Sequence, residues 1–270
     1  MTIELGILGA GNMAEAIARG VIRSGVLRAE QILAADISPQ RRELFSGELG
    51  IAATEDSAGV ARQSRILLLS VKPQHMGELL GRIGGVSSPD TLLISIAAGI
   101  STRFIESRLG GEKNWRVIRT MPNTPMLVGE GAVALARGRH ATEQDAAAAR
   151  RLFHAAAEVI DVSEDKLDAV TALSGSGPAY FFYLVEQMIR AGTELGLSAE
   201  ESRKLAIKTA VGSAKMLATS ADTPQELRRK VTSPGGTTQA AITHLDQHHA
   251  DQTIVDALKA AARRSGELGS

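Results

Sequence analysis

The stretch that decides the fold is Leu5-Gly6-Ile7-Leu8-Gly9-Ala10-Gly11-Asn12-Met13-Ala14. It carries the spacing G-x-G-x-x-A at Gly9, Gly11 and Ala14, between an apolar run and a helical pattern over residues 13–24. Gly9 permits a tight turn, Gly11 lets the backbone approach a pyrophosphate, and Ala14 allows close packing of the helix on the strand. The free N–H groups and the dipole of the helix start would then bind phosphate. The alternative is a purely structural turn.

Short apolar runs alternate with helical patterns in the first part of the chain. Strands are predicted over residues 3–8, 32–35, 65–71, 91–97, 115–120, 132–136 and 158–162. From residue 164 onward the strand signals stop, and helices are predicted over residues 165–195, 199–218, 224–231, 237–249 and 252–268. We therefore expect an α/β Rossmann-type domain with a mostly parallel sheet over residues 1–163, followed by an all-α domain over residues 164–270.

Composition excludes several classes of protein. The 30 Lys and Arg balance the 30 Asp and Glu, which leaves no broad electrostatic footprint for nucleic acid or an anionic membrane. Cysteine is absent, which excludes disulfides, thiolate metal sites and a cysteine nucleophile. No apolar run is long enough to span a membrane and no signal peptide is apparent, so we expect a cytoplasmic protein. His244 and His248 have helical zinc-site spacing, but no Glu follows His244 and no third ligand is indicated, so we expect no metal.

The residues after the second predicted strand leave the cofactor open. A carboxylate at Asp36 would hold an adenosine ribose 2′-hydroxyl, which favours NAD. Ser38, Arg41 and Arg42 follow closely and could accept the 2′-phosphate of NADP. Ser38 before Pro39 also predicts a helix start, with Ser38 as the N-cap. The cap and the cofactor contact are compatible, and the sequence does not decide between NAD and NADP.

Further motifs occur at strand ends and in the helical half. SVKPQ, SIAAG and RTMPNTP end predicted strands, where ligands bind in doubly wound sheets. LSGSGPAY (residues 173–180) and TSPGGTT (residues 232–238) lie among the predicted helices. Together with GILGAGNMA, these motifs resemble those of the pyrroline-5-carboxylate reductase family in order and spacing, over essentially the whole chain.

The resemblance implies a reaction and an assembly. A nicotinamide cofactor, NADP(H) or alternatively NAD(H), passes hydride to the imine carbon of L-1-pyrroline-5-carboxylate and gives L-proline, the last step of proline biosynthesis. The helical domain interlocks with that of a second subunit to form a homodimer. Such dimers often assemble into larger rings, here a pentamer of dimers (a homodecamer).

The resemblance also implies site residues. Cofactor contacts are implied for Leu8, Gly9, Ala10, Gly11, Asn12, Met13, Asp36, Ser38, Ser57, Val71, Lys72, Pro73, Ala97, Ala98 and Gly99. Substrate contacts are implied for Met121, Asn123, Ser176, Ser233, Gly235, Gly236, Thr237 and Thr238. Of these, Thr238 resembles the catalytic hydroxyl that hydrogen-bonds the ring nitrogen. The turn 233–236 before a helix would also offer free N–H groups to a carboxylate, although an ordinary helix entry with a Thr cap has the same pattern.

The two alternative functions are a β-hydroxyacid dehydrogenase and a nicotinamide-binding regulator without catalysis. A β-hydroxyacid dehydrogenase has a catalytic lysine shortly after a glycine pair in its helical domain. Here Gly175 and Gly177 are followed by Pro178, and no lysine occurs between Lys166 and Lys204. A nicotinamide-binding regulator without catalysis could retain the glycine loop, but it would have no reason to keep SPGGTT.

The aromatic residues are concentrated in one place. Half of the eight form the run Tyr180-Phe181-Phe182-Tyr183, just inside a helix predicted to begin near Gly177. Consecutive helical residues point about 100° apart, so the run covers most of the circumference. We expect burial on all sides, which in a chain of this size implies a second subunit.

Overall fold

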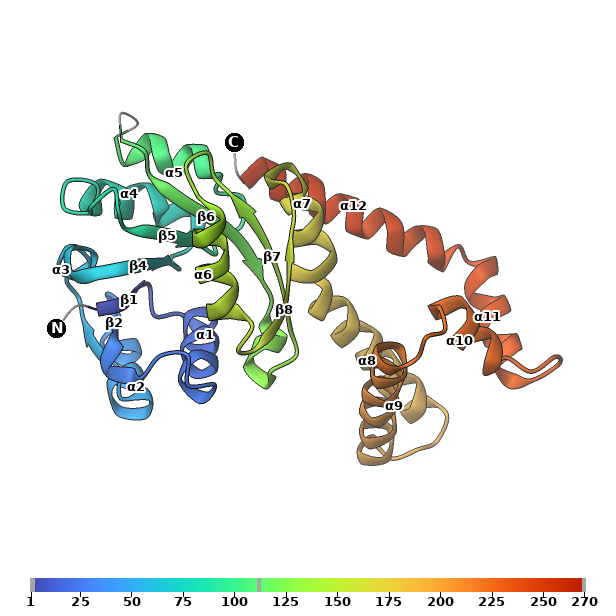
Figure 1. Cartoon of the computed structure of the whole chain (residues 1–270). Coiled ribbons are helices and arrows are strands. Elements are labelled where there is room, and N and C mark those ends of the chain that lie inside the picture. Colours follow the sequence, from blue (N-terminus) through green and yellow to red (C-terminus); the bar gives the residue numbers. More distant parts are fainter. Residues whose placement is uncertain (1–2, 111–112, 269–270) are drawn as a thin grey trace. The chain divides into compact units, whose positions relative to one another are not determined.

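The computed structural model describes residues 3–110 and 113–268. Within these residues an eight-stranded sheet has the order β3-β2-β1-β4-β5-β6-β7-β8 (Figure 1). Only the β6–β7 pair is antiparallel among its pairs. The strands are β1 (Ile3–Leu8), β2 (Ile32–Ala35), β3 (Ala52–Thr54), β4 (Ser64–Leu69), β5 (Leu92–Ser95), β6 (Arg116–Pro122), β7 (Gly131–Arg137) and β8 (Ala157–Asp161). The expected α/β fold with a mostly parallel sheet is confirmed.

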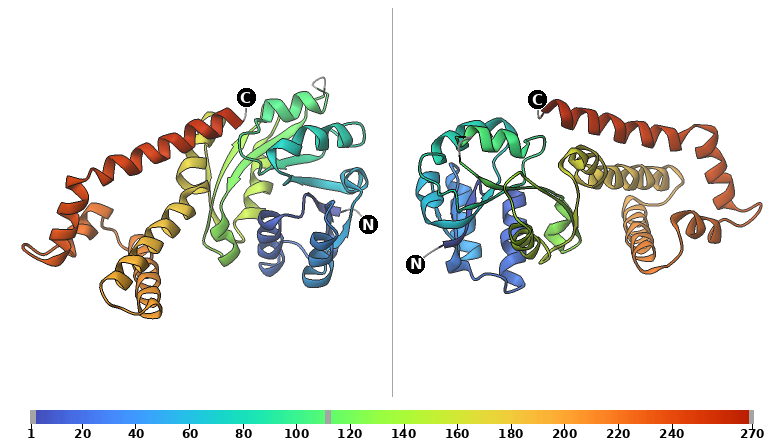
Figure 2. Two further views of the ribbon diagram at one scale, coloured as in Figure 1. Left: turned by 180° about the vertical axis from the view of Figure 1, so that it is seen from behind. Right: turned by 45° about the horizontal axis from the view of Figure 1, so that its top comes forward.

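Helices cover both faces of the sheet, as the views from behind and from above also show (Figure 2). One core lies beneath α1 (Asn12–Arg23), α2 (Pro39–Leu49) and α6 (Glu143–Phe153). The opposite core lies beneath α3 (Ser57–Gln63), α4 (Pro73–Ile83) and α5 (Thr102–Arg108). The central strands are apolar on both faces because both faces are buried.

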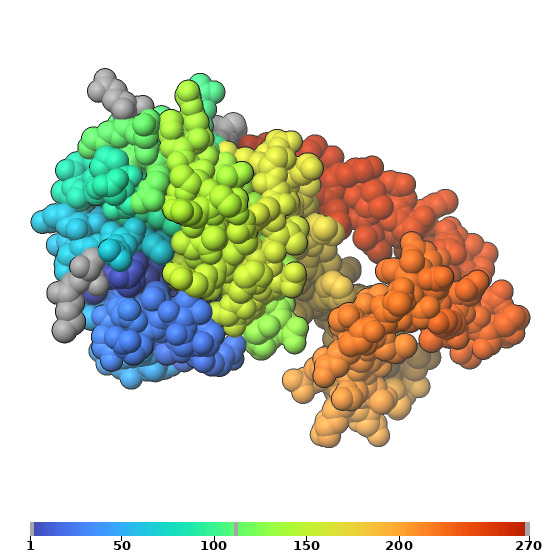
Figure 3. All heavy atoms as spheres, viewed as in Figure 1, coloured from blue at the N-terminus to red at the C-terminus, as the bar shows by residue number. Residues whose placement is uncertain are grey.

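Shorter segments connect these elements. They are the 3₁₀ turns η1 (Ala29–Gln31), η2 (Thr124–Val128) and η3 (Glu164–Lys166), the short helix α7 (Leu167–Val170) and the π-helical turn η4 (Thr171–Gly175). In Figure 3 the blue N-terminal helices and the yellow-green α6 region lie side by side, in agreement with their shared core.

The chain divides into two compact units. Residues 3–176 and 260–268 form the first, and Gly177–Lys259 forms the second. The second contains α8 (Gly177–Glu194), α9 (Ala199–Thr219), α10 (Pro224–Lys230), α11 (Thr237–Gln247) and the first part of α12 (Ala250–Leu268). The last part of α12 is held in the first unit, where Ser265 Oγ donates to Asp168 Oδ1 at 2.7 Å.

The two units differ sharply in how many of their hydrophobic side chains are buried. All the described hydrophobic clusters lie in the first unit. Among the described residues of the second unit, burial is limited to Gly177, Ser202 and Ala206. No helix in the described part of the chain has the length and apolarity that crossing a membrane requires.

The sequence missed two features of the fold. β3 has only three residues at a sheet edge, too few for a clear alternation pattern. The helix expected over residues 165–195 is interrupted by η3 and η4, and the regular helix α8 begins at Gly177. The sheet ends at Asp161, just before the boundary expected at residue 163, while residues 164–176 pack with the first unit.

Candidate active site

The glycine loop between β1 and α1 is fixed from two sides. Gly9 has φ +99°, and its N–H donates to the Ala35 carbonyl at 2.8 Å. A Cβ on Gly9 would lie 2.8 Å from the Ser70 carbonyl oxygen, so only glycine fits this turn. The Ser70 hydroxyl in turn donates to the carbonyls of Leu8 and Gly9. The neighbouring strand ends therefore hold the loop in one conformation.

Gly11 differs from Gly9, because no protein atom lies close to the position that a side chain on Gly11 would occupy. It is the N-cap of α1 with φ −71°, and no side chain caps the helix start. A Cβ built on Gly11 would meet no atom within 4 Å. The next residues, Asn12 and Met13, begin α1, whose first-turn N–H groups have no partner within the helix. This open start of α1 fits the phosphates of a dinucleotide.

Asp36 ties the end of β2 to this loop. Its Oδ2 accepts the Ala10 N–H at 2.6 Å, and its Oδ1 accepts the Ser38 N–H at 2.8 Å. Ser38 is the N-cap of α2, and its hydroxyl oxygen accepts the Arg41 N–H at 3.3 Å. The predicted cap is thus confirmed. Ile37, between them, is 82% exposed, which leaves an apolar side chain beside the carboxylate.

The acidic residue in the first turn of α1 is neutralised by arginines. Glu15 Oε2 pairs with Arg41 Nη2 at 2.8 Å, and Glu15 Oε1 pairs with Arg19 Nε at 2.9 Å. Burial alone would raise the pKa of Glu15, but the hydrogen bonds from Arg41 and Arg19 hold that pKa below its usual value. The negative charge of Glu15, close to the predicted phosphate site, is therefore balanced by Arg41 and Arg19.

The other predicted cofactor residues also follow parallel strands at the same edge of the sheet. Ser57 begins α3 after β3, and Val71, Lys72 and Pro73 join β4 to α4. Lys72 is the exposed N-cap of α4, whose start also lacks a side-chain cap. Ala97, Ala98 and Gly99 follow β5, where Ser95 Oγ accepts the Ala97 N–H at 3.3 Å and Gly99 has φ +77°. The structure thus brings these segments to the carboxyl edge, as expected for a doubly wound sheet.

Two motifs that are far apart in the sequence meet after β6. Asn123 Oδ1 accepts the Ala132 N–H at 2.8 Å, and Asn123 Nδ2 donates to the Ser174 carbonyl at 3.1 Å. Met121 lies against Gly175, where a Cβ would come within 2.5 Å of the Met121 methyl carbon. RTMPNTP and LSGSGPAY are thus joined through the π-helical turn, a geometry often found at functional sites. Ser176 directly follows this turn.

Substitution of Asn123 should therefore affect stability. We expect Asn123→Ala to lower the free energy of unfolding by about 1–3 kcal/mol, since it leaves the Ala132 N–H and the Ser174 carbonyl without this partner. Urea denaturation followed by circular dichroism measures the change. The exposed Asn114→Ala serves as the control. An unfolding free energy equal to that of the unsubstituted protein would refute this structural role.

The turn from Ser233 to Gly236 lies in the second unit, before α11. Gly235 has φ +71°, and the Gly236 N–H donates to the Ser233 carbonyl at 3.0 Å. The N-cap of α11 is Gly236 and no side chain caps this helix, so the Thr cap allowed by the sequence is not formed. Thr237 is exposed and Thr238 half-buried in the first turn. The first-turn N–H groups thus form a candidate carboxylate site.

Three features of the site were not predicted from the sequence. One is the pair of hydrogen bonds by which Ser70 holds the glycine loop. The Gly235 N–H donates to Gln239 Oε1, so one N–H group of the candidate carboxylate site already has a partner. Buried Arg119, two residues before Met121, faces Glu164 at 3.4 Å. The position of Ser70 at the end of a predicted strand was the only sequence signal for its role. No sequence signal indicated the contacts of Gln239 and Arg119.

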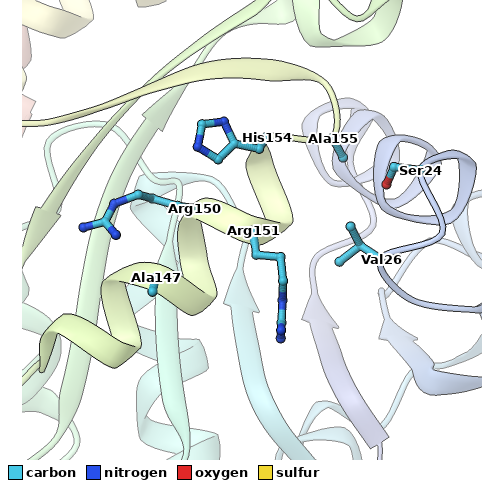
Figure 4. Close-up of a pocket in the computed structure, with 7 residues that line it drawn as sticks. All are labelled: Ser24, Val26, Ala147, Arg150, Arg151, His154 and Ala155. Carbon is cyan, nitrogen blue, oxygen red and sulfur yellow. The ribbon is translucent and has the colours of Figure 1, made fainter.

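One groove on the surface lies away from these motifs (Figure 4). It has a volume of about 470 Å³, and its lining comes from the C-terminal ends of α1 and α6. Figure 4 shows Arg150 and Arg151 pointing apart, and Arg150 is engaged by Glu143 and Asp161. Basic side chains at the C-terminus of a helix interact favourably with the helix dipole, which accounts for Arg150 and Arg151 in the last turn of α6 without a bound ligand.

The two histidines with zinc-site spacing contact each other. The rings of His244 and His248 have centroids 4.2 Å apart, and His248 Nδ1 lies 2.8 Å from the His244 carbonyl oxygen. Among the described residues, no three His, Asp or Glu side chains gather as a metal site would require. The expectation that no metal is bound stays a prediction.

Comparison with known proteins places this geometry in a family. A model described as pyrroline-5-carboxylate reductase dimerisation matches residues 164–268, and one described as NADP oxidoreductase coenzyme F420-dependent matches residues 4–99. The pyrroline-5-carboxylate reductase of pea (Pisum sativum) is 39% identical over 264 residues, covering 98% of this chain and 95% of the relative. This chain belongs to the pyrroline-5-carboxylate reductase family. It is therefore an oxidoreductase, and the resemblance inferred from the motifs is confirmed.

Solved structures of the family share the fold over the full length. A pyrroline-5-carboxylate reductase from Coxiella burnetii is similar with a TM-score of 0.90 and 34% identity, covering 100% of both chains. A pyrroline carboxylate reductase from Plasmodium falciparum, solved with NADP bound, has a TM-score of 0.89 and 30% identity, covering 99% of this chain and 98% of the other. The reductase thus has the family's Rossmann-type and helical parts in the same order.

Proposed function

We propose that this reductase converts L-1-pyrroline-5-carboxylate to L-proline, the last step of proline biosynthesis, with NADP(H), or alternatively NAD(H), as its cofactor. Family membership over the whole chain supports the reaction. The NADP-bound relative from Plasmodium falciparum and the match to an NADP oxidoreductase model support the cofactor. The observation that carries the proposal is the open glycine loop joined to an uncapped helix start.

The residues fit a dinucleotide in their chemistry. Gly9, Gly11 and the start of α1 would hold the pyrophosphate, and Asp36 with Ser38 would meet the adenosine ribose. Lys72, Ala98 and Gly99 follow the neighbouring strands at the same edge. The cofactor supplies the hydride that reduces the C=N bond, so the protein has to position the imine carbon.

The second unit would bind the substrate itself. The N–H groups at the start of α11 would receive the carboxylate of the ring, once Gln239 Oε1 releases the Gly235 N–H. The Thr238 hydroxyl would hydrogen-bond the ring nitrogen and hold it in place. A protonated imine needs little further help from a general acid, so these contacts would suffice to orient it.

A direct assay tests the reaction. We expect purified protein to oxidise NADPH or NADH when pyrroline-5-carboxylate is added, and to form L-proline in equal amount. A panel of β-hydroxyacids with NAD⁺ or NADP⁺ should give no turnover, because the helical part lacks a lysine after Gly177 in the required position. Folded protein that leaves the imine unreduced would overturn the proposal.

Thr238 can be tested separately from the cofactor site. We expect Thr238→Ala to lower kcat/KM for pyrroline-5-carboxylate about 100-fold, because the lost hydroxyl orients the reacting nitrogen. The dissociation constant for the cofactor should remain unchanged. Thr219→Ala is the matched control, because the Thr219 hydroxyl bonds the Lys215 carbonyl within its own helix. Equal losses in turnover and cofactor binding would contradict the proposed role.

The assembly and location of the enzyme are part of the proposal. Residues 164–268 match the dimerisation region of the family, and we infer a homodimer through this region. Five such dimers would make a decamer of 28.4 kDa chains, whose mass sedimentation analysis would give directly. The balanced charge and the lack of cysteine suit a cytoplasmic enzyme.

A further inference from the structure

The loop between β5 and α5, residues 96–101, lies where the nicotinamide half of the dinucleotide is expected. In the proposed cofactor site, the adenosine ribose meets the end of β2 and the pyrophosphate meets the start of α1. The strand order β2-β1-β4-β5 then places the remaining half of the cofactor over the carboxyl ends of β4 and β5. The conformation of this loop therefore helps to determine where the nicotinamide ring lies.

One carboxylate holds the point where this loop enters α5. Glu164 Oε1 accepts the backbone N–H of Thr102 at 2.7 Å, and Glu164 Oε2 accepts the Thr102 hydroxyl at 2.7 Å. Thr102 is the first residue of α5 and is 4% exposed. Hydrogen bonds to a charged acceptor are about twice as strong as those between neutral groups. Glu164, which is 62 residues further along the chain, thus fixes the end of the loop.

Arg119 holds that carboxylate in place from the neighbouring strand. Its side chain is 8% exposed, and its Nη1 donates to Glu164 Oε1 at 3.4 Å. Its Nη2 lies 3.9 Å from Asp168 Oδ1. Arg119 is in register with Ser95, the last residue of β5, so it stands directly beside the start of the loop. Because a buried charge requires partners, the guanidinium keeps both carboxylates close to β6.

The same side chains reach the substrate side of the predicted site. Asp168 lies in α7, which continues directly into the π-helical turn η4. In that turn, the Ser174 carbonyl accepts a hydrogen bond from Asn123, one of the predicted substrate residues. All of these residues belong to the first unit. The cluster around Arg119 therefore connects the loop after β5 with the turn beside the substrate residues.

The consequence concerns the geometry of hydride transfer, and it rests on the function proposed above. A displacement of about 1 Å between reacting groups costs on the order of 100-fold in rate. We propose that Glu164 is a positioning residue for hydride transfer. Through Thr102 it sets the loop beside the nicotinamide, and through Arg119 it keeps that loop in register with the turn on the substrate side.

Three variants test this role by separating turnover from binding. Glu164→Ala should lower kcat for imine reduction on the order of 10- to 100-fold, with KM for the imine and Kd for the cofactor unchanged to within about threefold. Glu164→Gln should restore kcat to within about threefold, because its amide accepts the Thr102 N–H and donates to the Thr102 hydroxyl. Thr102→Val, which keeps Glu164 and its bond to the backbone, should lower kcat several-fold.

Asp145→Ala is the matched control for a loss of stability alone. Asp145 also accepts the N–H and the hydroxyl of a threonine, Thr142, and pairs with an arginine of β6, Arg116, at 2.9 Å. Arg116 is the first residue of β6, at the opposite end of the strand from Pro122. This variant should therefore lower Tm but leave kcat of the folded enzyme unchanged.

The emission of bound NADH or NADPH gives a readout that needs no turnover. A nicotinamide ring that is held less rigidly emits less, so emission should fall in Glu164→Ala at unchanged Kd and stay constant in Asp145→Ala. Unchanged kcat in folded Glu164→Ala, or an equal loss of kcat in Asp145→Ala, would overturn the inference. If Glu164→Ala does not fold, unchanged kcat in Thr102→Val would overturn it instead. Nucleotide binding without imine reduction by the unsubstituted enzyme would contradict the proposed function, and the emission would still decide whether Glu164 positions the nicotinamide.

Discussion

A Gly11→Val variant is expected to fold normally and to lose nicotinamide dinucleotide binding. Its backbone has φ −71°, which valine adopts without strain, and an added Cβ would meet no protein atom within 4 Å. The fold therefore loses only the small preference for glycine at an N-cap, about 1 kcal/mol. The isopropyl group would instead stand before the first turn of α1, where the phosphates need to approach the backbone. Titration with NADH and NADPH should show at least a 100-fold loss of affinity, on the order of 3 kcal/mol.

Two comparisons separate this effect from general damage. Gly81→Val adds the same side chain in α4, also with no atom within 4 Å of its Cβ, and should leave cofactor affinity unchanged. Gly9→Ala should instead destabilise the fold, because Gly9 has φ +99° and no room beside Ser70. Unchanged nucleotide affinity in folded Gly11→Val would refute the assignment of the glycine loop to phosphate binding.

Local patterns predicted seven of the eight strands, and with them the edge of the sheet at which the predicted cofactor residues lie. β1 and β2 have the predicted bounds, because apolar runs end sharply at Leu8 and at Ala35. The parallel order brings Gly11, Asp36 and Lys72 to one edge, since each lies within three residues of the carboxyl end of a strand. Such predictions succeed because the signals for a strand and for the start of the next helix lie within a few consecutive residues of the sequence.

Contacts between distant residues could not be predicted in this way. Nothing near Arg41 in the sequence indicates that it pairs with Glu15 of α1. The same holds for Asn123, whose partner Ser174 lies in another motif. Gln239 has an ordinary helix-start position, and only the structure reveals its bond to Gly235. Each depends on long-range packing or side-chain conformation rather than on sequence period.

A Phe182→Glu variant is expected to lose the dimer, and with it the stability of the helical part. In the single chain Phe181 is 61%, Phe182 69% and Tyr183 67% exposed, although a helix start rich in aromatic residues is costly to leave in water. The second unit has almost no core of its own, so a partner has to supply one. Full burial of one Phe side chain is worth about 1.5–3 kcal/mol, and a buried, unpaired carboxylate would cost more.

The predicted result is a change in mass together with a loss of cooperative unfolding. Sedimentation at micromolar concentration should show dimers or larger assemblies for the unsubstituted enzyme and monomers for Phe182→Glu. Ile160→Glu is the matched control: Ile160 is 53% exposed on β8 and lies outside the dimerisation region, so this variant should remain dimeric. A stable, active monomer of the unsubstituted enzyme would contradict the prediction, because the exposed aromatic helix would then lack the partner that its composition requires.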